Sequence, residues 1–285
     1  MNLTGLSRVL TGFTFLSAAS LVAQVRYVQV TPTVIQQRLD LYKGNDTTRE
    51  AALVRLFTEA GCSAGNLSEQ PVPGRKQPNV ICVLPGTTQS TIVVGGHFDH
   101  IAAGEGIADN WSGASLLPSL FQSLAGSPRK HTFVFVGFTG EEEGLVGSAF
   151  YVKRLAKDQL ANIEAMINFD TLGLGPTEVW ASQSDPLLVN RLVAIARTLK
   201  MSITGMNVNG VGRSDEESFI GKGVCTITVH SVTPETLHVL HSSSDNPTAI
   251  RFSDYYETYR LLASYLAVLD TLEAPASKGC KIKPL

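Results

Sequence analysis

The chain has 285 residues, of which 44% are hydrophobic and 17% are charged, and its formal net charge is −2. This hydrophobic content suffices for a large buried core and excludes an intrinsically disordered chain. The near-neutral balance, without a block of Lys or Arg, argues against nucleic acid as a partner.

The N-terminus has the pattern of an export signal. Arg8 precedes an apolar run over residues 9–23 that ends in small residues. This pattern is typical of a cleaved signal peptide, and the run is too short and too rich in Ser, Thr and Gly to span a bilayer well. We therefore expect a signal peptide at 1–23, a secreted or periplasmic protein, and no stable membrane insertion after signal removal. An uncleaved anchor or a buried N-terminal helix is the alternative.

The mature region, residues 24–285, is expected to form a single domain. In chain order we predict helices and strands from hydrophobic periodicity and turn residues. The predicted helices cover residues 31–43, 47–60, 109–126, 144–157, 186–199 and 249–272. The predicted strands cover residues 79–86, 90–97, 131–138, 163–170, 179–182 and 224–230. Pro118 should kink or break the third helix, and the tail 273–285 should be extended.

Strands thus alternate with helices, and several strands are almost entirely apolar or β-branched. Such strands are covered on both faces, as in parallel sheets. The sequence therefore predicts an α/β fold, a three-layer α/β/α sandwich with a mostly parallel, mixed central sheet.

The chain has four cysteines, an even number that favours disulfides in an exported protein. Cys62 and Cys82 flank a 19-residue polar loop rich in Pro and Gly, so we predict that they pair. The pair Cys225–Cys280 then follows by elimination. Because no Cys-x-x-Cys spacing occurs, we expect no zinc site built from thiolates.

Polar side chains cluster just after the predicted strands, where open α/β sheets place their functional groups. The segments are GGHFDH (95–100), ADNWSGA (108–114), GEEEGLVGS (140–148), INFD (167–170), GRSDEESF (212–219) and HSSSD (241–245). Imidazole and carboxylate together form the ligand chemistry of zinc.

Each candidate ligand has a plainer explanation when it is taken alone. His97 and Asp99 could be a surface pair, although a carboxylate beside a metal-bound imidazole commonly orients its ring. Glu141 and Glu142 could be an acidic helix start, although adjacent carboxylates can also divide the work of general base and ligand.

Each of the remaining three candidate ligands also has an ordinary structural explanation when it is taken alone. Asp109 could cap a helix, Asp170 could be a turn residue, and His241 could be a solvated loop residue with His230 and His238 as rivals for its role. Together, however, two His, two Asp and one Glu at one edge of the sheet make a complete two-metal set.

The ordered segments resemble the two-zinc aminopeptidases of metallopeptidase family 28, over roughly residues 77–272. The family's H-x-D is matched by His97 and Asp99, and its D-N-x-S-G-A/V by the segment that Asp109 opens. Its G-E-E-x-G-L-x-G-S is matched at 140–148, and its N-x-D by the segment that ends in Asp170. Its terminal H-T/S-x-x-D is matched by residues 241–245, which selects His241 over the two rival histidines.

The resemblance implies the site and the activity. The metal ligands would be His97, Asp109, Glu142, Asp170 and His241. One Zn²⁺ would take His97 and Asp170, the second Zn²⁺ would take Glu142 and His241, and Asp109 would bridge them. Glu141 would be the general base and Asp99 a second catalytic group. The chain would then be a single zinc peptidase domain, a monomer that acts on peptides with a free N-terminus.

One segment departs from the family pattern. Members often carry Ser-Asp-His where this chain has Ser214, Asp215 and Glu216. No metal ligand is lost, but this loop helps to shape the substrate pocket. Beside it, Arg213 is a candidate for orienting the substrate backbone, and a plain surface arginine is the alternative.

Three other functions remain open from sequence. A single-zinc acyltransferase of the glutaminyl cyclase type shares this scaffold, and the metal count would separate the two enzymes. A non-catalytic binding domain would keep the fold but lose ligands, whereas this chain keeps all five ligand positions and Glu141. A carboxypeptidase or dipeptidase on a similar scaffold usually carries an added lid or dimerisation domain, and the spacing from Asp170 to His241 leaves no room for a sizeable insertion.

Overall fold

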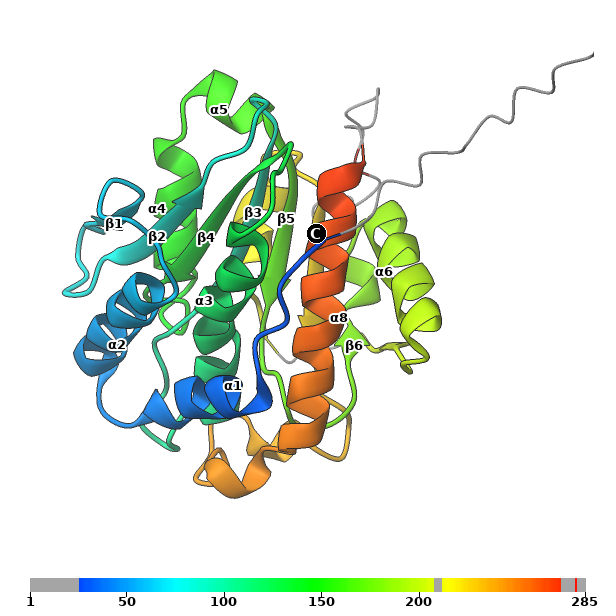
Figure 1. Ribbon diagram of the computed structural model, residues 1–285. Coiled ribbons are helices and arrows are strands. Elements are labelled where there is room, and N and C mark those ends of the chain that lie inside the picture. The colour runs from blue at the N-terminus through cyan, green and yellow to red at the C-terminus, as the bar shows by residue number, and fades with distance from the viewer. Residues whose placement is uncertain (1–25, 208–211, 273–279, 281–285) are drawn as a thin grey trace, which may run out of the picture.

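The computed structural model describes residues 26–207, 212–272 and 280 (Figure 1). The signal peptide expected at 1–23 lies outside the described residues, as does the predicted tail apart from Cys280.

One mixed sheet organises the described chain. Its strands are β1 (Leu67–Gln70), β2 (Asn79–Leu84), β3 (Thr91–His97), β4 (Thr132–Phe138), β5 (Ile163–Phe169), β6 (Glu178–Val179), β7 (Thr204–Gly205) and β8 (Thr226–His230). They lie in the order β1-β2-β4-β3-β5-β8-β6-β7. The central strands β4, β3, β5 and β8 are mutually parallel, whereas β2 is antiparallel to β4 and β6 to β8. The carboxyl ends of the four central strands therefore meet at one edge.

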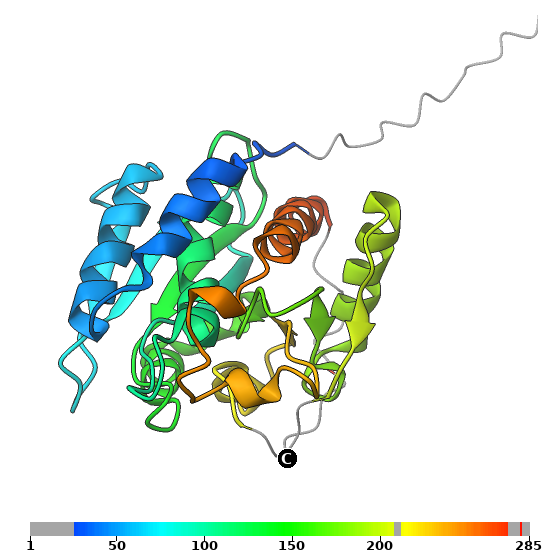
Figure 2. The same cartoon turned by 90° about the horizontal axis from the view of Figure 1, so that it is seen from below.

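Helices cover both faces of this sheet (Figures 1 and 2). The core of one face is built with α1 (Pro32–Leu39), α2 (Asp46–Glu59), α3 (Ser112–Ala125), α6 (Pro186–Leu199) and α8 (Phe252–Thr271). The other face is covered by α4 (Val146–Arg154), α5 (Lys157–Ala161) and α7 (Glu216–Ile220). The predicted three-layer sandwich is therefore confirmed.

Alternation along the strands divides the core between the two faces. Val94 packs with the α3 side, whereas its neighbour Val93 packs with the α4 side. Since successive strand residues point to opposite faces, a strand that is apolar at every position must be covered twice. This explains why TIVVGG reads as continuously apolar.

The predicted elements are found with small shifts at their ends, with four differences. The strand predicted at 179–182 is reduced to β6 (Glu178–Val179), and Ala181–Gln183 form a 3-10 helix instead. The short elements β1, β7, α5 and α7 have no counterpart in the prediction. Pro118 lies inside α3 without ending it, because the helix is buried between the sheet and its helical neighbours, and this burial offsets the lost hydrogen bond. Finally, Asp109 does not open α3: it lies with Asn110 in non-helical conformation before Ser112.

Both predicted disulfides, Cys62–Cys82 and Cys225–Cys280, are formed. The first joins the end of α2 to β2, and the second joins the segment before β8 to the C-terminal region. Within the described ranges, no helix combines the length and apolar character needed to cross a membrane.

Candidate metal centre

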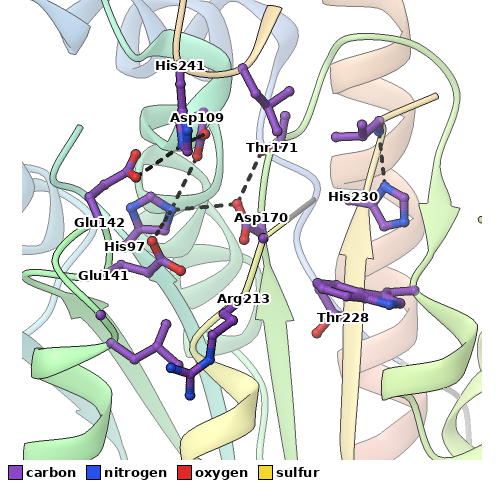
Figure 3. Close-up of a pocket in the computed structure, with 16 residues that line it drawn as sticks. His97, Asp109, Glu141, Glu142, Asp170, Thr171, Arg213, Thr228, His230 and His241 are labelled. Atoms are coloured by element: carbon purple, nitrogen blue, oxygen red, sulfur yellow. Dashed lines mark hydrogen bonds and ion pairs between the residues drawn. The ribbon is translucent and has the colours of Figure 1, made fainter. Parts of the chain in front are cut away.

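The five predicted metal ligands converge at the carboxyl edge of the parallel strands (Figure 3). His97 ends β3, Asp170 follows β5, and Glu142 follows β4. His241 lies in the long connection between β8 and α8, and Asp109 lies in the turn before α3. Parallel strands bring together residues that are more than 140 positions apart in the sequence.

Asp109 lies between the two histidines. Its Oδ1 is 3.4 Å from His97 Nε2, and its Oδ2 is 3.2 Å from His241 Nε2. Each histidine also faces a second carboxylate: His97 Nε2 is 3.6 Å from Asp170 Oδ1, and His241 Nε2 is 3.1 Å from Glu142 Oε2. Two imidazole–carboxylate pairs thus share one bridging carboxylate.

The buried Asp99 supports both sides of this arrangement. Its two carboxylate oxygens accept hydrogen bonds from the backbone N–H groups of Glu141 and Glu142, each at 3.2 Å. Its Oδ1 also lies 3.6 Å from His97 Nδ1, whose nearer contact is the Asp99 backbone oxygen at 3.2 Å. Asp99 therefore links the orientation of the His97 ring to the loop that carries the two glutamates.

Two residues with no role in the predicted site hold Asp109 in place. Asp245 accepts the N–H groups of Ala108 and Asp109 at 2.8 and 3.0 Å. Asn110 donates to the Phe169 carbonyl at 2.8 Å. Both residues belong to the sequence motifs that match the family, so the motifs could have marked them as part of the site. Their hydrogen-bond partners are distant in the sequence, however, and the motif spacing does not predict these contacts.

Backbone strain is concentrated around this site. Four non-glycine residues of the described chain have positive φ, and three of them, Leu145, Thr171 and His241, line the same cavity (φ 63°, 59° and 54°). A β-branched residue such as Thr171 rarely adopts this conformation. Strain of this kind persists where the surrounding contacts fix a functional geometry.

Carboxylates outnumber imidazoles at the centre, and burial, hydrogen bonds and neighbouring charges shift the pKa values of these groups. Burial raises the pKa of Glu141 to about 10, and the charges of Asp170 and Asp215 add to the rise against the opposing effect of His97. Burial, with the charge of Asp109, raises the pKa of Glu142 to about 7. The hydrogen bond to Asp109 raises the pKa of His241 to about 9. The centre therefore has an excess of negative charge that a cation can neutralise.

The donor set fits zinc. Imidazole nitrogens and carboxylate oxygens of His97, Asp109 and Glu142 lie within 4.8 Å of one another, as do those of His97, Glu141 and Asp170. Glu142 Oε1 is buried and has no hydrogen-bond partner among the described residues, as expected for an oxygen that faces a metal position. A third group, Asp185 with Cys225 and Cys280, is not comparable because its two sulfurs form a disulfide.

A cavity of about 260 Å³ opens beside the centre. Apart from the candidate ligands, its lining includes the apolar side chains of Leu145, Trp180, Val232 and Leu240. His230, one of the rival histidines, also lines the cavity, but its ring is engaged with Met206 O and Val232 N. The other rival, His238, is exposed. Of the three candidates, His241 alone faces the ligand carboxylates (Figure 3).

In the segment 213–216, which departs from the family pattern, one side chain lines the cavity and another is buried. Arg213 lines the cavity with a side chain that is 65% exposed, and its Nε lies 2.6 Å from Glu217 Oε2. Glu216 is instead fully buried, and its Oε2 accepts a hydrogen bond from Asn168 at 2.9 Å. The glutamate that replaces the family's histidine therefore lies behind the site.

Comparison with known proteins gives a family and a set of relatives. The sequence model for Peptidase family M28 matches residues 79–266. Leupeptin-inactivating enzyme 1 of Streptomyces exfoliatus is 32% identical over 197 residues, which is 65% of this chain and 40% of that protein. The chain thus spans less than half the length of this curated relative.

Solved structures show the same fold. The LapA aminopeptidase of Legionella pneumophila superposes with a TM-score of 0.76 at 20% identity, covering 85% of this chain and 74% of LapA. The zinc aminopeptidase BSAP of Bacillus subtilis gives a TM-score of 0.63 at 22% identity, covering 73% and 54%. A glutaminyl cyclase from an Acidobacteriales bacterium gives a TM-score of 0.70 at 18% identity, covering 84% and 93%.

Proposed function

The chain belongs to peptidase family M28, a family of peptide hydrolases, and we propose that it is an exported aminopeptidase that uses two zinc ions. The observation that carries this proposal is the position of Asp109. A carboxylate whose two oxygens face two different imidazoles, at 3.4 and 3.2 Å, is suited to bridge two metal ions.

The same geometry supports the ligand assignment that the family resemblance implies. His97 and Asp170 would hold one zinc ion, Glu142 and His241 would hold the other, and Asp109 would serve both. Zinc bound here supplies positive charge that polarises the scissile carbonyl and acidifies water. Asp99 keeps the His97 ring in its ligating orientation through the contacts described above.

Glu141 is the proposed general base. Its carboxylate lies 3.9 Å from His97 Nε2 and takes no part in the bridged pairs. In the proposed reaction it accepts a proton from the water whose oxygen bonds to the carbonyl carbon, and it returns that proton to the amine when the C–N bond breaks. Burial raises the pKa of Glu141 to about 10, and positive charge held by the neighbouring ligands would lower this pKa and favour the ionised base.

The proposed substrates are peptides with a free N-terminus, whose first side chain enters the cavity beside the centre. Arg213 at the cavity mouth is proposed to orient the substrate backbone. Arg213→Ala should then raise KM for a peptide substrate severalfold while kcat changes little, because an exposed arginine contributes binding more than chemistry. An unchanged KM in steady-state assays would remove Arg213 from the site.

We also propose that residues 24–285 form one zinc peptidase domain that is secreted or periplasmic and monomeric. Two disulfides are consistent with an oxidising compartment. The exposed large hydrophobic side chains of the described residues, Val28, Ile101 and Leu187, lie on separate segments and form no obvious contact surface. Light scattering of the mature chain tests the monomer.

A single-zinc glutaminyl cyclase is the second candidate. It is favoured by the structural likeness to the Acidobacteriales cyclase, of which the match covers 93%. The bridging position of Asp109 between two complete imidazole–carboxylate pairs favours the two-zinc peptidase instead.

The decisive experiment combines elemental analysis of the purified mature chain with hydrolysis of aminoacyl p-nitroanilides, with and without a chelator. About two zinc ions per chain and chelator-sensitive hydrolysis would support the proposal. One tightly held zinc, no hydrolysis and cyclisation of an N-terminal glutamine would support the cyclase. A chain without metal would instead be a binding domain on this fold.

A further inference from the structure

Arg49 is a fully buried cation beneath the segment that carries the metal ligands. It lies on α2, and its guanidinium donates hydrogen bonds to three main-chain carbonyls. Nε donates to Tyr42 O at 3.0 Å, Nη1 to Phe98 O at 3.2 Å, and Nη2 to Glu105 O. Among the described residues, no carboxylate lies within ion-pair distance of the Arg49 guanidinium.

Two of these carbonyls belong to the stretch between the first ligand and the bridging ligand. Phe98 directly follows His97, and Glu105 lies four residues before Asp109. The far end of the stretch is held by Asp245, whose backbone oxygen accepts the Glu105 N–H at 2.7 Å. Residues 98–109 are therefore fixed from two directions, by α2 and by the loop that follows His241.

The chemistry of this position requires an arginine. A planar guanidinium has five N–H donors in a rigid fork, so one side chain can serve three carbonyls that lie in different directions. The ring of Trp111 lies 5.9 Å from the guanidinium carbon and adds a further contact. Burial lowers the pKa of Arg49 to about 10, and the charges of Asp46, Asp245, Asp99 and Asp109 oppose this fall, so the side chain stays charged at neutral pH.

We propose that Arg49 is a positioning residue that preforms the metal-binding segment before metal arrives. It acts through the carbonyls of Phe98 and Glu105, which set the relative positions of His97, Asp99 and Asp109. The inference rests on the proposed metal site, but it does not depend on the substrate or on the reaction.

The direction in which zinc affinity changes when Arg49 is replaced distinguishes a positioning role from a purely electrostatic role. A buried positive charge near the ligands repels a metal cation, so removing the charge alone would tighten zinc binding. Loss of the three hydrogen bonds would instead leave residues 98–109 less ordered in the apo chain. Zinc binding would then have to order this segment, and the free-energy cost of that ordering would weaken zinc affinity. The two roles of Arg49 therefore predict opposite changes.

The test measures zinc affinity of the apo chain by competition with a chromophoric chelator, for the wild type and three variants. Arg49→Met should weaken zinc affinity by about tenfold or more, the range for residues that support metal ligands. Arg49→Lys keeps the charge without the fork, and about a threefold to tenfold loss is expected.

The matched control is Arg38→Met. Arg38 is also a buried arginine on a neighbouring helix, but it donates to the side chains of Ser119 and Gln122, away from the ligands. This variant should lower Tm while zinc affinity stays within about twofold of wild type. Hydrogen exchange of residues 98–109 in the apo chain should accelerate in the Arg49 variants alone.

Unchanged or tighter zinc binding by Arg49→Met would overturn the inference. Should that variant fail to fold, wild-type affinity in Arg49→Lys would overturn it equally. A wild-type chain that binds no zinc would refute the proposed function itself, so the two failures are distinguishable.

Discussion

Adjacent carboxylates in this chain have different environments, and this difference predicts different mutant behaviour. Glu142 faces His241 at 3.1 Å, whereas Glu141 is outside both bridged pairs and its nearest imidazole nitrogen is 3.9 Å away. In Glu141→Gln the ligand set is intact, so we expect zinc content to be kept while kcat falls by about 10²–10⁴-fold, the usual contribution of a general base.

Glu142→Gln is the matched comparison, because it removes a ligand at the neighbouring position. It should lose zinc as well as activity. Elemental analysis and p-nitroanilide kinetics on both variants provide the readout. Near-wild-type turnover in Glu141→Gln would show that another group takes the proton.

The sequence predicts the candidate ligand side chains but not what holds them. His97, Asp109, Glu142, Asp170 and His241 are predicted because the segments that carry them match, in order, the motifs of metallopeptidase family 28. The positioning contacts of Arg49, Asn110 and Asp245 join residues that are 49 to 137 positions apart. Such contacts depend on how the helices and loops pack, and no local spacing encodes them.

At the scale of elements, the helices and strands that the sequence predicts well are those with a clear periodic pattern of hydrophobic residues. The long apolar strands and the amphipathic α6 are recognisable because burial on a sheet face or helix face imposes a regular pattern. The elements β7 and α7, of two and five residues, are too short to show a period. The helical start expected at Asp109 was wrong: Asp109 and Asn110 are non-helical, and their segment is held by long-range hydrogen bonds to Asp245 and to the Phe169 carbonyl instead.

The short helix α7 carries a buried acid with a testable effect on stability. Burial raises the pKa of Glu216 to about 8, while an unfolded chain ionises this group near its ordinary value of 4.5. Between these values the folded state keeps a proton that the unfolded state has lost. Glu216 therefore lowers the free energy of unfolding progressively as pH rises from about 4.5 to about 8.

Glu216→Gln should remove this pH-dependent loss while still accepting the hydrogen bond from Asn168. Relative to wild type, its free energy of unfolding should rise by roughly 3–4 kcal/mol between pH 5 and pH 8, since one pKa unit corresponds to about 1.4 kcal/mol. Urea unfolding with chelator present measures it. The exposed Glu59→Gln is the control, with little change expected. If the difference in free energy of unfolding between Glu216→Gln and wild type were the same at every pH, the raised pKa of the buried Glu216 would be contradicted.

At the scale of the whole molecule, the proposed metal centre is separate from the apolar cores and the disulfides that stabilise the fold. Two apolar cores lie on opposite faces of the sheet, and two disulfides close loops elsewhere. The proposed ligands lie at the sheet edge, at or beyond the strand ends. The fold should therefore not require metal, unlike small domains whose core is the metal site itself.

Removal of zinc should accordingly lower stability without unfolding the chain. A ligand that binds only the folded state stabilises it by about 2.7 kcal/mol at 100 times its Kd, which for a domain of this size corresponds to a fall in Tm of roughly 5–10 °C on chelation. Far-UV circular dichroism at 25 °C should stay unchanged. Glu142→Gln, which lacks a ligand of the proposed site, should show a smaller fall with the same chelator. Loss of the helical signal on chelation would instead mean that the fold depends on a cation at this site.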